Sequence, residues 1–90
     1  MTGSARVVMY STGWCPYCER ARALLSRKGV EFTEIRVDEQ PAARETMIRL
    51  SGGRRTVPQI FVGDDYLGDS DEIHALDREG RLDELLAVGT

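Results

Sequence analysis

The 90-residue sequence predicts an α/β fold, in which helices cover both faces of one four-stranded mixed sheet. Three observations support this prediction. In the first half of the chain, short apolar runs typical of buried strands alternate with longer segments of helical periodicity. Two further strand-like runs then follow each other across a short turn. Two helical segments close the chain, and together these features give the order β-α-β-α-β-β-α-α.

The first strand and helix surround the most distinctive part of the sequence. Residues Val7–Tyr10 form a continuous apolar run that predicts a buried strand, and residues 11–13 predict a loop. Pro16 then occupies the first position of a predicted helix, where a backbone N–H is not needed. Lys28 and Gly29 end this helix, as a cation in the last turn followed by a glycine cap. The helix has one apolar face, made of Tyr17, Cys18, Ala21, Leu24 and Leu25.

The middle of the chain predicts a second strand and a second helix. Residues Val30–Val37 have the composition of a strand, but the alternation breaks between Phe32 and Ile35, which an edge strand tolerates. Pro41 starts the second helix, and the Gly52–Gly53 pair ends it. A strand, a helix and a strand in this order make the first two strands parallel.

The remainder of the chain predicts an antiparallel strand pair followed by helices. The third and fourth strands, at Gln59–Val62 and 66–67, are separated by a tight turn and are therefore antiparallel. Asp69 and Glu72 have the spacing of a capping box, which starts the third helix. A short fourth helix follows. This order of elements is that of a thioredoxin-like fold.

Composition and charge restrict the functional class. We expect a single domain over residues 1–90, with residues 1–5 as a flexible N-terminal tail. The net charge of −3 provides no electrostatic footprint for nucleic acid. No apolar run approaches the length of a signal peptide or of a membrane span. We therefore expect a cytoplasmic protein that acts as a monomer and does not bind membranes.

Cys15 and Cys18 are the only cysteines, and they carry the predicted chemistry. The cytoplasm keeps thiols reduced, so a close pair is expected to be catalytic or metal-binding rather than structural. Their spacing places both sulfurs on one side of the first helical turn. Cys15 falls at the N-cap, where unpaired N–H groups and the positive end of the helix dipole favour the thiolate. Only a thiolate attacks a disulfide, so Cys15 is the predicted nucleophile and the more buried Cys18 is the resolving thiol.

A zinc site is the main alternative for such a cysteine pair. Structural zinc takes four cysteine or histidine ligands, whereas this chain has two cysteines and one histidine. The histidine, His74, lies far along the chain within a predicted helix and has no ligand-like neighbour. We therefore predict no metal, and we interpret the pair as a redox dithiol beside a β-α-β unit.

Three segments resemble the signatures of the dithiol glutaredoxins, and they are most similar to the bacterial glutaredoxin 3 subfamily. These segments are Cys15–Cys18, Thr56–Val62 and Gly68–Asp71, which have the order and spacing found in that family. The similarity extends from about Val7 to Leu86. It implies a glutathione-dependent thiol–disulfide oxidoreductase that reduces protein disulfides and glutathione mixed disulfides. Glutathione is then a co-substrate, and no cofactor is tightly bound.

The resemblance implies a role for each residue of these segments. Cys15 would be the nucleophile and Cys18 the resolving thiol. Pro58 would be a cis-proline that faces the dithiol and presents the Val57 backbone to the cysteinyl part of glutathione. The γ-glutamyl carboxylate would meet backbone N–H groups at a helix N-terminus, and the Asp71 side chain would hold the ammonium group. The complete implied glutathione-binding set is Tyr17, Thr56, Val57, Pro58, Gly68, Ser70 and Asp71.

Simpler structural roles stay open for several of these residues. Pro58 is alternatively a trans proline of an edge strand, Tyr17 a core residue, and Asp71 only a helix cap. Trp14, directly before the first cysteine, either shields the thiolate or contacts substrate, or else it is an exposed indole with only a packing role.

Two positions depart from the family pattern. Thr12 stands where the family usually has a lysine or arginine that contacts a glutathione carboxylate. Asp69 stands where the family has the second glycine of a pair. The missing cation and the added anion are expected to weaken glutathione binding, unless Asp69 acts mainly as a helix cap. Arg54 and Arg55 are candidates for supplying the missing positive charge.

Two other functions stay open at the level of the sequence. One is a thioredoxin-like reductant that takes electrons from a flavoprotein reductase and ignores glutathione. The other is a binding module, in which two chains share an iron–sulfur cluster through Cys15 and two glutathiones. Pro16 counts against this module because it stiffens the loop. The protein partners that the resemblance implies are disulfide-containing or glutathionylated proteins, with ribonucleotide reductase as one example.

Overall fold

The computed structural model describes residues 6–86, which form four strands and four helices. The predicted flexible tail at residues 1–5 lies outside the described residues. None of the helices within residues 6–86 has the length and apolar character needed to cross a membrane. The elements follow the predicted order, with the bounds β1 Val7–Ser11, α1 Pro16–Arg27, β2 Phe32–Arg36, α2 Pro41–Leu50, β3 Gln59–Val62, β4 Asp65–Gly68, α3 Ser70–Arg78 and α4 Leu82–Leu86.

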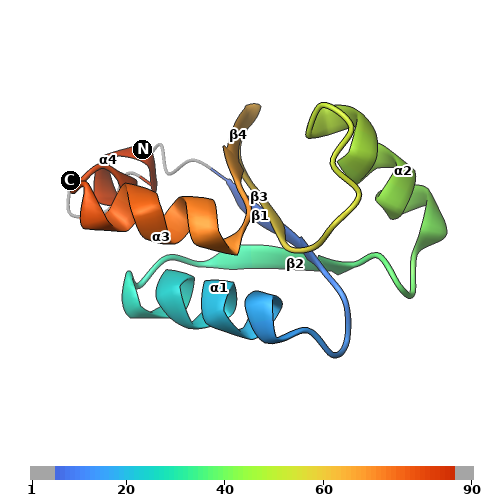
Figure 1. Ribbon diagram of the computed structural model, residues 1–90, viewed down its shortest axis with the longest axis horizontal. Coiled ribbons are helices and arrows are strands. Elements are labelled where there is room, and N and C mark those ends of the chain that lie inside the picture. Colours follow the sequence, from blue (N-terminus) through green and yellow to red (C-terminus); the bar gives the residue numbers. More distant parts are fainter. Residues whose placement is uncertain (1–5, 87–90) are drawn as a thin grey trace.

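The strands form one mixed sheet in the order β2-β1-β3-β4 (Figure 1). β1 pairs in parallel with β2, while β3 is antiparallel to both β1 and β4. The mixed sheet and the edge position of β2 confirm the predictions. β2 begins two residues later and ends one residue earlier than the predicted strand Val30–Val37. It ends at Arg36 because the N–H groups of Glu39 and Gln40 both donate to the Arg36 carbonyl and turn the chain.

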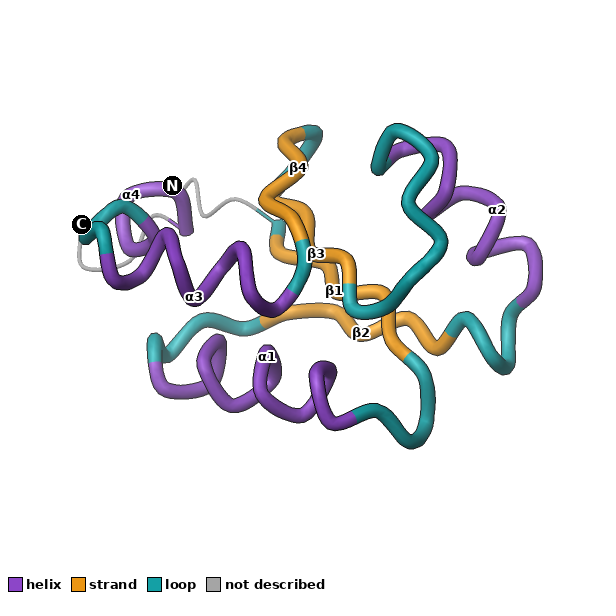
Figure 2. The backbone as a smooth tube through the Cα atoms, viewed as in Figure 1, coloured by secondary structure: helices purple, strands orange, loops and turns teal. Residues whose placement is uncertain are grey.

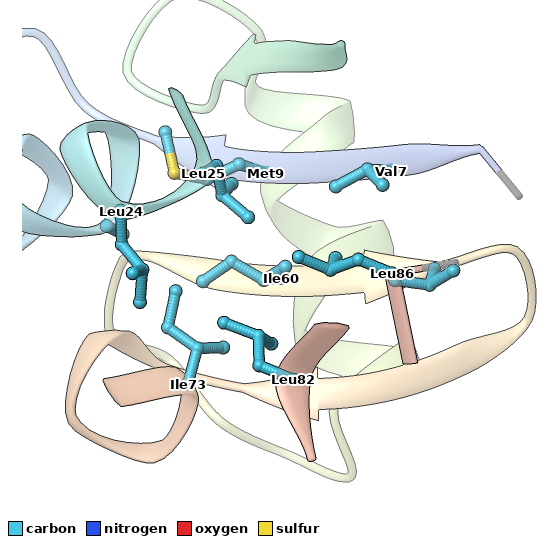
Figure 3. Close-up of a cluster of buried hydrophobic side chains, with 10 residues drawn as sticks. Val7, Met9, Leu24, Leu25, Ile60, Ile73, Leu82 and Leu86 are labelled. Atoms are coloured by element: carbon cyan, nitrogen blue, oxygen red, sulfur yellow. The ribbon is translucent and has the colours of Figure 1, made fainter. Parts of the chain in front are cut away.

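Side chains of the two central strands alternate between two hydrophobic clusters on opposite faces of the sheet. On β1, Met9 belongs to the first cluster and Tyr10 to the second. On β3, Ile60 and Phe61 divide in the same way, as the two-residue period of a strand requires. Helices α1, α3 and α4 complete the first cluster (Figure 3), and α2 contributes Met47 to the second. Helices therefore cover both faces, as predicted.

Three segments of the chain meet at one end of the sheet (Figure 2). They are the loop from β1 to α1, the loop from α2 to β3, and the junction between β4 and α3. Because α1 and α3 both start here and pack against each other, their N-terminal ends border the same pocket. The fold thus brings unpaired backbone N–H groups of two helices to one place.

Replacing Leu24 by alanine tests how strongly the first cluster supports α1. Leu24 is 1% exposed, so its truncation should lower the free energy of unfolding by about 2–5 kcal/mol. The matched control is Leu50→Ala on α2, where the side chain is 51% exposed and the loss should stay near 0.5 kcal/mol. Urea denaturation of both variants measures the difference. Equal losses would contradict the assignment of Leu24 to the core.

Candidate active site

A pocket at this end of the sheet has three walls. The start of α1 supplies one wall, the α2–β3 loop supplies a second, and the start of α3 supplies the third. Its lining residues, which define the site pocket, are Tyr17, Thr56, Val57, Asp69, Ser70 and Asp71. Every one of them except Asp69 belongs to the predicted glutathione-binding set. Tyr17 is 54% exposed, so the alternative of a core tyrosine is wrong.

Cys15 lies at the N-cap of α1, as its position before Pro16 predicts. Its backbone is extended, with φ −160° and ψ 109°, and the Cys18 N–H donates to its sulfur at 3.2 Å. The Cys15 thiol also lies 3.9 Å from the Val57 carbonyl oxygen, which it faces as a hydrogen-bond donor. The side chain is half-buried, so the sulfur is accessible. A sulfur so placed gains from the N–H bond and from the helix dipole when it is anionic.

Cys18 lies one helical turn further and is only 1% exposed. Burial, together with the hydrogen bond to Cys15, raises the pKa of Cys18 to about 12, and a hydrogen bond with the Thr12 backbone and the charge of Arg22 offset only part of this. At neutral pH, Cys18 is therefore a protonated thiol. The two cysteines thus differ in exposure and in hydrogen bonding, which is what a nucleophile and a resolving thiol require.

The loop before β3 presents the Val57 backbone to Cys15. The Val57–Pro58 peptide bond is cis, so the alternative of a trans edge-strand proline is wrong. Buried Gln59 anchors the loop, because its Nε2 donates to the Thr56 carbonyl at 2.9 Å and its Oε1 accepts from the Tyr66 hydroxyl. The sequence shows no role for this glutamine beyond the signature. The one feature that could have indicated its anchoring role is that it is a polar residue at the start of an otherwise apolar strand.

The N-terminus of α3 forms the opposite wall. Asp69 and Glu72 make the predicted capping box, with both reciprocal hydrogen bonds at 2.9 Å. Gly68 has φ +119°, and a Cβ at this position would lie 2.5 Å from Glu72 Oε1, so the chain needs glycine here. Ser70 is 1% exposed, and its hydroxyl has no hydrogen-bond partner within residues 6–86. Asp71 is exposed and lies 3.9 Å from Arg20.

The loop before Cys15 is fastened to the end of β2. The Gly13 N–H donates to Asp38 Oδ2 at 3.1 Å, and the Arg36 guanidinium donates to both oxygens of that carboxylate. This arginine lowers the pKa of Asp38 to about 2. A Cβ on Gly13 would lie 2.1 Å from Arg36 Nη2, so a side chain here would push the end of the Arg36 side chain aside. The sequence contains no sign of this arrangement, because the residues lie about 25 positions apart.

The structure also locates the two arginines considered as substitutes for the missing cation. Arg54 Nη2 donates to Asp69 Oδ2 and to Glu72 Oε1, both at 2.9 Å. Arg54 is therefore bound to the added anion rather than free. Arg55 is exposed, and its carbonyl accepts from Arg44. The Trp14 indole is 86% exposed, so it buries little surface and a packing role is minor, while contact with substrate stays open.

Comparisons with known proteins agree with this geometry. The family model "Glutaredoxin" matches residues 7–67. Over 82 residues the chain is 52% identical to a glutaredoxin of Pseudomonas aeruginosa and 52% identical to glutaredoxin 3 of Escherichia coli K12, covering 91% of this chain in each case and 96% and 98% of the relatives.

Two solved structures extend the comparison to the fold. The solution structure of a glutaredoxin from Brucella melitensis is 46% identical, with a TM-score of 0.83, and covers 99% of this chain and 96% of its own. The crystal structure of a buckwheat glutaredoxin–glutathione complex is 28% identical, also with a TM-score of 0.83. The match covers 92% of this chain and 77% of the buckwheat chain. The thioredoxin-like arrangement predicted for the sheet and helices is thereby confirmed.

Alkylation should distinguish the two thiols. With iodoacetamide at pH 8, we expect complete modification of Cys15 before Cys18 is measurably modified, because Cys18 is buried and protonated. Mass spectrometry of the digested protein assigns each site. The control is Cys15→Ser, in which the remaining thiol should still react more slowly than free glutathione, since burial is the largest cause of its raised pKa. Equal rates at the two positions would contradict the assigned roles.

Proposed function

Because the chain belongs to the glutaredoxin family of oxidoreductases, we propose that it reduces glutathione mixed disulfides and protein disulfides with glutathione as co-substrate. One observation carries the proposal. The Cys15 sulfur accepts the N–H of Cys18 at 3.2 Å and lies 3.9 Å from the carbonyl of Val57, which lines the site pocket. A tripeptide bound along Val57 therefore places its own sulfur next to the nucleophile.

In the first step, the Cys15 thiolate attacks the glutathionyl sulfur of a mixed disulfide. A bond forms between this sulfur and Cys15, the original S–S bond breaks, and the substrate leaves as a thiolate that takes a proton from water. The hydrogen bond from Cys18 N–H and the dipole of α1 stabilise the attacking anion. The step moves the disulfide to the enzyme without any net change in the number of disulfide bonds.

The second step has two routes. A second glutathione thiolate attacks the bound glutathionyl sulfur, which forms glutathione disulfide and frees Cys15. Alternatively, Cys18 attacks Cys15, glutathione leaves, and the Cys15–Cys18 disulfide is later reduced by two glutathiones. For a protein disulfide, Cys15 first joins one substrate sulfur, and Cys18 then releases the reduced substrate.

The order of events follows from the interaction between the two thiols. Part of the rise in the pKa of Cys18 comes from its hydrogen bond to Cys15 and from the charge of Cys15. Both are lost once Cys15 forms a mixed disulfide, so Cys18 then gives up its proton more easily. Burial, the largest cause of the raised pKa, persists in the intermediate, so loss of these two smaller causes favours resolution but does not by itself switch Cys18 on.

The site pocket supports binding of glutathione in one orientation. The Val57 backbone, held by the cis peptide bond before Pro58, is available for strand-like pairing with the cysteinyl residue. The γ-glutamyl carboxylate would meet the N-terminus of α3, where the buried Ser70 hydroxyl has no partner among the described residues. The exposed carboxylate of Asp71 would hold the ammonium group. Thr56 and Tyr17, which line the pocket, would border the bound tripeptide, and Gly68 directly precedes the Asp69 wall.

The two routes predict different phenotypes for the two cysteines. Cys15→Ser should abolish all turnover, because no other thiolate stands at the helix N-terminus. Cys18→Ser should retain removal of glutathione from a small mixed disulfide and lose reduction of a protein disulfide by the dithiol route. NADPH oxidation coupled through glutathione reductase measures the first activity, and insulin reduction measures the second.

The coupled assay also separates this proposal from that of a glutathione-independent reductant. Turnover that requires a flavoprotein thioredoxin reductase and not glutathione would contradict the proposed function. Loss of glutathione removal in Cys18→Ser, with the fold intact by circular dichroism, would contradict only the monothiol route.

Thr12→Lys should restore the cation that the family usually has at this position. An exposed charge contact contributes about 0.2–1 kcal/mol, so the KM for glutathione should fall by up to about fivefold at low salt. The gain should shrink as the salt concentration rises. Thr12→Gln is the neutral control of similar length. A KM that is the same for lysine and glutamine would place the glutathione carboxylate away from residue 12.

A further inference from the structure

One guanidinium group joins two walls of the site pocket. Arg54 lies in the α2–β3 loop, three residues before Val57, whereas its partners, Asp69 and Glu72, lie at the start of α3. Both contacts measure 2.9 Å, and the guanidinium carbon stands 5.9 Å from the centroid of the Tyr66 ring. A cation held on three sides thus links the α2–β3 loop to the start of α3, beside the pocket that Asp69 lines.

The same contacts neutralise negative charge on the wall formed by the start of α3. Asp69 places a carboxylate beside the helix N-terminus proposed to bind the γ-glutamyl carboxylate, where like charges repel. Asp69 Oδ2 accepts from Arg54, and Asp69 Oδ1 accepts from the Glu72 N–H. Both oxygens therefore have donors from the protein, and Arg54 supplies a compensating charge. Arg54 is also the first cause of the lowered pKa of Glu72.

We propose that Arg54 is a positioning residue for glutathione, which screens Asp69 and fixes the distance between the Val57 loop and the start of α3. This inference rests on the proposed function. In it, Arg54 does not touch the ligand. It makes the pocket compatible with an anionic γ-glutamyl group despite the aspartate at residue 69, and it accounts for how this chain accommodates its departure from the family glycine.

The test uses the choice between two substrates. A peptide carrying a glutathionyl disulfide is compared with the same peptide carrying a cysteinylglycine disulfide, which lacks the γ-glutamyl residue. The ratio of their kcat/KM values reports recognition of that residue. Loss of general folding or of Cys15 reactivity lowers both values and leaves the ratio unchanged, so a purely structural role of Arg54 would not move it.

Arg54→Gln should lower this ratio by up to about fivefold, mainly through KM, and the loss should shrink at high salt. Asp69→Asn retains a good N-cap and removes the charge, so its ratio should equal or exceed that of the unmodified protein. The Arg54→Gln, Asp69→Asn double variant should recover at least half of the loss. Arg81→Gln, which breaks the exposed pair with Glu79 at the far end of α3, is the control and should have no effect.

Two results would overturn the inference. The ratio is unchanged in Arg54→Gln, or the double variant is as impaired as Arg54→Gln alone, which would mean that Arg54 does not act by screening Asp69. A third result concerns the proposed function itself. If the unmodified protein does not prefer the glutathionyl peptide, the pocket does not bind glutathione as proposed, and the inference about Arg54 is rejected together with it.

Discussion

The hydrogen bond from the Cys18 N–H to the Cys15 sulfur connects the fold with the chemistry. It exists because Pro16 starts α1 directly after Cys15, which makes that cysteine the helix cap. The position of α1 is in turn fixed by its buried face against the central strands. The place of the Cys15 sulfur therefore depends on the start of α1, which depends in turn on the sheet, and a shift of α1 by one residue would remove the sulfur from the cap.

The electrostatics of the site divide between groups that act on the sulfur and groups that hold the surrounding segments. The helix dipole and the buried Cys18 act on Cys15 itself. Arg36 and Arg54 instead form salt bridges with carboxylates, Arg36 with Asp38 and Arg54 with Asp69. The carboxylates around both arginines neutralise their charge. The site therefore depends on backbone N–H groups more than on free cations.

Local patterns accounted for most of the fold. The strands β1 and β3, the start of α1 and the capping box of α3 follow from apolar runs, a proline and two acids at fixed spacing. The cis peptide bond at Pro58 followed from the family signature, because no local pattern distinguishes it from a trans bond. The end of β2 was wrong by one residue, since a turn stabilised by two bonds to Arg36 overrides the apolar Val37.

Contacts between charged side chains that lie far apart in the chain could not be predicted from the sequence. Arginine is common in this chain, and nothing in the spacing of Arg54 and Asp69 indicates that they meet. The same holds for the pairing of Asp38 with Gly13. Such partners are set by the tertiary arrangement, in which the ends of separate strands and helices come together. Burial follows from periodic patterns, whereas the choice of a partner for an exposed charge does not.

The closeness of Gly13 to Arg36 bears on how this loop can diverge among related sequences. A Cβ at residue 13 would lie 2.1 Å from Arg36 Nη2, which is the far end of a flexible side chain and can move aside. Such a substitution would displace the guanidinium from Asp38, the carboxylate that also accepts the Gly13 N–H. Residues 13, 36 and 38 are therefore expected to covary, whereas the exposed Trp14 can change without disturbing the packing of the fold.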